Sequence, residues 1–133
     1  MGYRSDVAYT IRFTDDHDTN NEQAFYTFLL EAKANPKLQI ALAEVKIDEK
    51  RHMFTFTATD VKWYESYPEV DSHMALVSLA EDWSCQVSEG KLNCLIGVVF
   101  LRIGEETNDI EERYQGDYEH SWLSVSRSIN TDW

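Results

Sequence analysis

Alternation of apolar and polar residues predicts a strand near each end of the chain. In VAYTIRF, residues 7–13, every second residue is apolar, which is the period of a strand with one buried face. WLSVSRSI, residues 122–129, repeats the alternation with serines on its polar side. We therefore expect an early strand and one final strand.

Residues 45–64 predict a hairpin with its turn at DEKR. The apolar residues of the second arm first fall on even positions, 54 and 56, and then on odd positions at Val61 and Trp63. Since one extra residue in a strand reverses its faces, this change of phase indicates a bulge near Asp60. Further on, the unbroken apolar centre of LNCLIGVVFLRI is typical of a covered strand with neighbours in the sheet.

Helical periodicity predicts two helices between these strands. The first follows a capping box that begins at Thr19, and it should end near Asn35-Pro36. The second should have Ser66 as its N-cap and Pro68 in its first turn. Residues 37–44 fit a short helical extension that leads into the next strand, but their pattern is ambiguous, so the type of that segment stays open. The inward positions are Phe25, Phe28, Leu29 and Ala32 in the first helix and Val70, Met74, Val77 and Trp83 in the second.

The order of these elements predicts the fold class. Strand, helix, hairpin, helix and further strands are expected to form an α+β fold with two helices packed on one face of a mainly antiparallel sheet. The arrangement is related to the ferredoxin-like fold, with C-terminal strand additions. A chain of 133 residues is the usual size of one domain, so residues 1–133 are expected to form a single globular domain.

Charge adds a preference for certain partners. The net charge is −12, and the segment from Asp60 to His120 has 14 acidic residues against 4 basic ones. Such a surface repels nucleic acid and membranes and attracts basic proteins. The start MGYRSDV lacks the pattern of a signal peptide, which favours the cytoplasm and reduced thiols at Cys85 and Cys94.

No familiar catalytic or metal-binding motif is present. DDHDTNNE has acidic residues at the spacing of a calcium loop but lacks that loop's glycine and its final glutamate. The four histidines are scattered, and His73 is expected at the edge of the core. There is no nucleophile elbow and no glycine-rich phosphate loop. The sequence therefore predicts no catalytic residue, metal or cofactor.

The segment GEETNDIEERYQGDYEH, residues 104–120, is the strongest candidate for a binding surface. Its seven carboxylates exceed the one or two charges that would protect a strand edge against aggregation. Whether it forms helix, strand or loop stays open, because Ile110, Tyr114 and Tyr118 also recur at helical spacing. The expected partner contacts are Glu105, Glu106, Asp109, Glu111, Glu112, Tyr114, Asp117, Tyr118 and Glu119.

A second candidate is the aromatic cluster in DVKWYESYPEV. Trp63, Tyr64 and Tyr67 surround the expected start of the second helix. They fit core packing, which we favour, and they also fit an aromatic anchor at an interface, since amphipathic rings serve both uses.

Four segments in order, GYRSDV, DVKWYESYPEV, RIGE with NDIEE, and SVSRSI, resemble a pattern in uncharacterised small acidic proteins of tailed phages and prophages. The resemblance implies a phage origin, expression in the bacterial cytoplasm and a counter-defence or host-takeover inhibitor. No activity or functional residue is carried over from that family.

The expected function is accordingly an acidic protein that blocks or modulates a basic, nucleic-acid-handling protein of host or phage, without binding nucleic acid itself. One alternative is a structural or morphogenetic phage component that self-associates into homo-oligomers. A second alternative is a small enzyme with an unrecognised site.

Overall fold

A computed structural model describes residues 3–14, 21–88, 95–106, 108–116, 123–125 and 129–131. Its strands are β1 (Ser5–Thr14), β2 (Lys46–Asp48), β3 (Met53–Val61), β4 (Leu95–Gly104), β5 (Ile110–Gly116), β6 (Leu123–Val125) and β7 (Ile129–Thr131). Its helices are α1 (Asn21–Lys33), the 3₁₀ turn η1 (Pro36–Leu38), α2 (Gln39–Glu44) and α3 (Pro68–Ser88).

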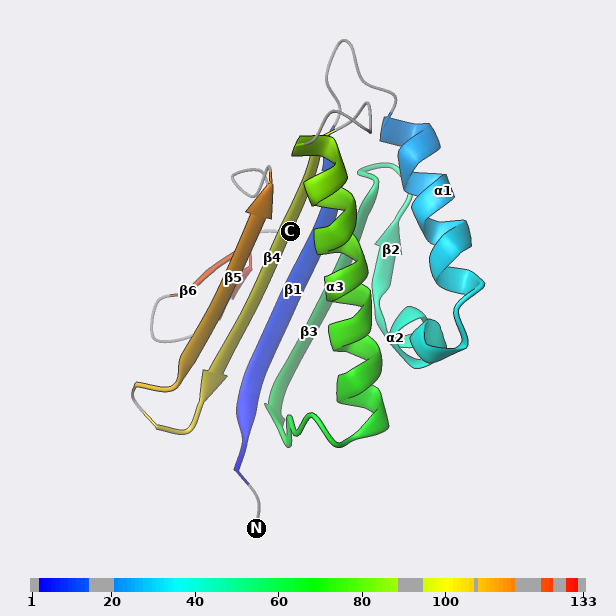
Figure 1. Cartoon of the computed structure of the whole chain (residues 1–133). Helices are drawn as coiled ribbons and strands as arrows, with labels where there is room; N and C mark the ends of the chain where they lie inside the picture. The colour runs from blue at the N-terminus through cyan, green and yellow to red at the C-terminus, as the bar shows by residue number, and fades with distance from the viewer. Residues whose placement is uncertain are drawn as a thin grey trace.

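Five strands form an antiparallel sheet in the order β2-β3-β1-β4-β5. Strands β3 and β4 run in the same direction on either side of β1, and α3 connects them, which is a split βαβ unit. The helices cover one face of the sheet (Figure 1). These features confirm the predicted α+β fold, and β5 with the β6–β7 hairpin follows β4 as the C-terminal addition.

Aromatic side chains fill the core between the sheet and the helices. The odd-numbered residues of β1, from Val7 to Phe13, are buried on this face, as the alternation predicted. The Phe13 ring lies 5.4 Å from Phe28 and 6.3 Å from Trp83, measured between ring centroids. Tilted and edge-on pairs of this kind add about 0.5–1.5 kcal/mol each beyond the area they bury.

The opposite face of the sheet is also buried along its central strands. Thr10 of β1 and both Val99 and Leu101 of β4 are at most 1% exposed there. The β6–β7 hairpin contacts β1 and β4, and Figure 1 shows β6 behind the sheet, away from α3. Because β4 is buried on both faces and paired on both sides, it has no polar face, which explains its unbroken apolar sequence.

The predicted bulge in β3 is confirmed. Ser5 lies opposite Val61 and Val7 lies opposite Ala58, so β3 has one more residue than β1 across this interval. Asp60 has a positive φ of 55°, and its N–H donates to Asp6 Oδ1 at 2.9 Å. The bulge returns Val61 to the face that packs under the helices.

Other predictions need correction or completion. Helix α3 begins at Pro68, and the Tyr67 carbonyl accepts from the Asp71 N–H, so Tyr67 and not Ser66 holds the N-cap position. The expected final strand is two short strands, β6 and β7. Leu123 lies opposite Thr131, and Val125 lies opposite Ile129, so the apolar residues have odd numbers in both strands. The sequence therefore shows the apolar–polar alternation of a single strand.

Residues 37–44, whose type was open, belong to η1 and α2. The expected cap at Thr19, residues 15–20 of the DDHDTNNE segment and Cys94 lie outside the described residues, and Asn21 and Glu22 are the first residues of α1. Within the described part of the chain, the helices are too short or too polar to cross a membrane.

Candidate functional site

The acidic segment begins as the turn between β4 and β5. The Gly104 N–H donates to the Asp109 carbonyl at 2.7 Å, and the Asp109 N–H donates to the Glu106 carbonyl at 3.0 Å. A side chain at position 104 would overlap the Asp109 carboxylate and the Tyr3 hydroxyl. Glycine therefore lets the turn pack closely against the N-terminal segment.

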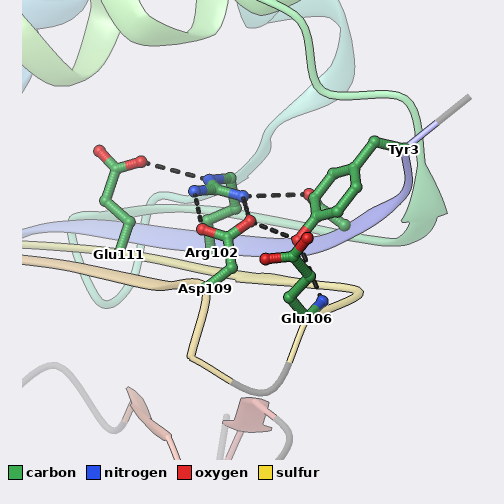
Figure 2. Close-up of polar contacts among 6 residues, drawn as sticks. Tyr3, Arg102, Glu106, Asp109 and Glu111 are labelled. Carbon is green, nitrogen blue, oxygen red and sulfur yellow. Dashed lines mark hydrogen bonds and ion pairs between the residues drawn. The ribbon is translucent and has the colours of Figure 1, made fainter.

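Arg102 binds two of the predicted acidic contacts (Figure 2). Its guanidinium donates to both carboxylate oxygens of Asp109, at 2.7 and 3.1 Å, and to Glu111 Oε1 at 3.2 Å. A further bond, at 3.3 Å, reaches the Ser5 hydroxyl. Paired bonds of this kind are charge-assisted and fix the orientation of both groups. Three charges meet in this network, and their sum is −1.

The Tyr3 hydroxyl connects the same network to the turn. It donates to Asp109 Oδ2 at 2.6 Å and accepts from the Glu106 N–H at 3.0 Å. The guanidinium of Arg102, followed by this hydroxyl, lowers the pKa of Asp109 to about 2. The hydrogen bond to the Asp109 carboxylate raises the pKa of Tyr3. Asp109 is thus held ionised and internally paired.

Strand β5 presents alternate residues to opposite faces. Ile110, Glu112 and Tyr114 are exposed, whereas the residues between them are half-buried. On the half-buried side, Arg113 forms an ion pair with Glu81 of α3 and lies over the Phe100 ring. On the exposed side, the Tyr114 hydroxyl donates to Glu112 at 3.1 Å. The open type of this segment is resolved as a strand for residues 110–116.

A hollow of about 300 Å³ lies beside Ile110 and the turn. Asp6 and Asp60, the two residues joined at the bulge, line it together with Glu105 and Glu106. Arg4 is the basic residue of the lining, and its N–H donates to Glu105 at 2.7 Å. Sequence analysis missed Asp6 and Asp60 because pairing between distant strands brings them to the turn.

The predicted contacts therefore fall into three groups. Asp109 and Glu111 are bound to Arg102. Glu105, Glu106, Glu112 and Tyr114 are exposed at the turn and on the outward face of β5. Asp117, Tyr118 and Glu119 lie outside the described residues.

The aromatic cluster around position 64 is partly structural. Trp63 packs against the core, with ring centroids 6.1 Å from Phe56 and 5.8 Å from His73. The Tyr64 hydroxyl accepts from the Tyr3 N–H at 2.6 Å. Tyr67, which is 38% exposed, stacks edge-on against Tyr64. The packing interpretation holds for Trp63, and Tyr67 leaves an aromatic surface in solvent.

His73 belongs to a second polar network, under the helices. It is 1% exposed, and its Nδ1 lies 2.6 Å from the hydroxyl of the buried Tyr9. Its Nε2 lies 3.3 Å from Glu44 Oε1 at the end of α2. Burial lowers the pKa of His73, against the opposing effect of Glu44, and burial raises the pKa of Tyr9 well above its usual value. A neutral His73 that accepts from Tyr9 and donates to Glu44 satisfies all three groups.

Among the described residues, no group of His, Cys, Asp and Glu is arranged to hold a metal ion. No family model matches the chain, and neither the curated proteins nor the solved structures include a significant match.

Proposed function

We propose that this protein binds a basic protein partner through its β5 face, which we define as Glu105, Glu106, Ile110, Glu112 and Tyr114. The observation that carries the proposal is the exposure of two large apolar side chains among acids. Ile110 is 40% exposed and Tyr114 is 42% exposed, and exposed glutamates lie beside both. Aromatic and apolar anchors within a charged rim are the usual composition of a binding hot spot.

The neighbouring hollow supports a cationic contact. Four carboxylates and one guanidinium line a space of about 300 Å³, which suits the end of a lysine or arginine side chain. Charges at such a surface act chiefly on the association rate, and salt screens them over about 8 Å at physiological ionic strength. A nucleic-acid-handling enzyme offers a basic groove, opposite in charge to this acidic face, and blocking that groove is the counter-defence role that the phage resemblance implies.

Site-specific photo-cross-linking tests the location of this interface. A benzophenone amino acid at position 114 should give a discrete adduct in a bacterial host, and the adduct should weaken when lysate is adjusted to high salt. Position 26 is the matched control, because Tyr26 on α1 is 37% exposed and lies off the β5 face. Adducts of equal yield from both positions would contradict the proposal.

Substitution of two adjacent glutamates distinguishes direct contact with the partner from an effect of net charge. Glu112→Gln and Glu111→Gln change the net charge equally, but Glu112 is on the outward face and Glu111 is bound to Arg102. We expect similar association rates for the two variants and faster dissociation, by about tenfold, for Glu112→Gln alone, which corresponds to about 1.4 kcal/mol. Equal dissociation rates would place the contact elsewhere.

Self-association is the second candidate function. Among the described strands, β5 pairs with β4 and forms one end of the sheet, so its outer edge is a template for another strand. Sedimentation of the wild type over a range of concentrations tests this candidate, and a mass that rises to a closed dimer would favour it over the basic partner.

A further inference from the structure

A pocket on the helix side of the sheet has no role in the β5 face. It has a volume of about 290 Å³ and lies where β3, the end of α2 and the start of α3 meet. Its inner wall is formed by Phe56, Trp63, Val70 and His73. The remaining lining residues are Glu44, Ala58, Val61, Lys62, Tyr67 and Glu69.

The bulge in β3 and the loop after it create the aromatic wall of this pocket. Because the bulge restores Val61 to the helix side, the loop that follows places Trp63 beside His73 and Phe56. The His73 ring itself lies 4.1 Å from Phe56, between centroids. Tyr67 follows in the turn that leads into α3, where its N–H donates to the Tyr64 carbonyl. The lining of the pocket thus combines aromatic rings with apolar side chains.

A carboxylate that is hydrogen-bonded to His73 lines this pocket. Glu44 is 44% exposed at its side chain, and His73 holds one of its oxygens. Among the described residues no other group is bonded to Glu44, and the neutral form of His73 leaves its negative charge uncompensated. Glu69 adds a second negative charge to the lining, and Lys62 adds one positive charge.

From this arrangement we propose that the pocket binds a quaternary or methylated ammonium group. Aromatic faces attract such cations through the ring quadrupole, and the methyl groups pack against Phe56 and Val70 without needing hydrogen-bond acceptors. An unmethylated ammonium would lose part of its solvation, because the lining apart from Glu44 and Glu69 is largely apolar. An anion would meet Glu44 and Glu69. Charge and surface chemistry therefore favour an alkylated cation over these two classes.

The probe for this site is choline, and its neutral analogue 3,3-dimethyl-1-butanol has the same shape. Both should be titrated into the full chain while the Trp63 indole N–H is followed by NMR. We expect choline to shift this signal and to bind about tenfold more tightly than the analogue, which is about 1.4 kcal/mol. Equal affinities would reduce the site to an apolar pocket and overturn the proposal, as would shifts confined to residues of the β5 face.

Matched variants test whether the Glu44 carboxylate contributes to cation binding. Glu44→Gln preserves an acceptor for His73 Nε2, so the fold should persist while choline affinity falls at least fivefold. Glu49→Gln in the β2–β3 turn removes the same charge from an exposed site outside the pocket and should leave affinity unchanged. An equal loss in both variants would mean that net charge, and not this pocket, recruits the cation. Glu112→Gln, which tests the proposed β5 face, should leave choline binding intact, so the two proposals fail separately.

Discussion

Two tyrosine-centred networks lie in this small protein and differ in their access to water. At the β4–β5 turn, Tyr3 donates to the half-exposed Asp109, which also binds Arg102. Under the helices, the buried Tyr9 donates to His73, which in turn reaches Glu44. The first network uses formal charges, whereas the buried part of the second is neutral. Ionised groups are retained where water and a counter-ion stabilise them, and neutral partners are used where burial would penalise charge.

The buried network should give the largest effect on stability. His73→Leu keeps most of the volume but leaves the Tyr9 hydroxyl without its acceptor, at an expected cost of about 2 kcal/mol in the free energy of unfolding. Adding Tyr9→Phe removes the orphaned hydroxyl, so the double variant should be more stable than His73→Leu alone. Urea unfolding of His73→Leu, Tyr9→Phe and the double variant provides the measurement. If the two substitutions simply add, the hydrogen bond at 2.6 Å contributes nothing specific.

Arg102→Met should have a smaller effect. It removes the partner of Asp109 and Glu111 and leaves two carboxylates close together, but solvent screens the half-exposed groups, so we expect a loss of about 1 kcal/mol. High salt should narrow the difference from the wild type, in contrast to the His73 variant. A salt-independent loss would indicate that the arginine stem, and not its charge, stabilises the turn.

The two networks should respond to acid in different pH windows. The pKa of His73 is lowered on folding, so the unfolded chain takes up a proton first as pH falls below 6.5. The stability that this network contributes is fully present above that pH. It is lost as the pH falls to the lowered pKa of His73 in the folded state. The pKa of Asp109 falls from 3.8 to about 2, so its contribution is complete above 3.8 and disappears near pH 2.

Unfolding of His73→Leu and Asp109→Asn at several pH values checks these windows. The wild type should lose its advantage over His73→Leu below pH 6.5 and its advantage over Asp109→Asn only below pH 3.8. A common window for both variants would mean that the two networks are not electrostatically distinct. Because solvent screens the half-exposed Asp109, we expect its contribution to stability to be smaller than its pKa shift alone implies.

Local patterns in the sequence predicted most of the fold. The alternation in β1 identified its buried face, and the reversal of parity at Val61 located the bulge. The N-cap of α3 was placed one residue early, because Ser66 has the right chemistry for a cap but the chain turns again at Tyr67. The type of the α2 segment stayed open because a contact that stabilises the helix is distant in sequence: the Ser72 hydroxyl of α3 accepts from the Ala41 N–H.

The candidate site was less accessible to sequence reasoning. Counting charges along residues 104–120 treats every carboxylate as available, although Arg102, outside that segment, lies directly across from Glu111 in the β4–β5 register. Tyr3 is more than a hundred positions from Asp109 and still shares a hydrogen bond with it. Only the pairing of β1 with β4 brings these residues together. A hairpin prediction for 95–116 would have revealed the Arg102–Glu111 pair but not the role of Tyr3.

The bulge at Asp60 also identifies a position in β3 where a one-residue deletion preserves the strand pairing. Two residues of β3 there lie opposite one residue of β1, so deleting one of them would restore regular pairing and still leave Val61 opposite Ser5. A deletion in a regular stretch of β3 would instead exchange the faces of the residues that follow it. The bulge is thus a position at which the chain can lose one residue and keep the same buried face of β3.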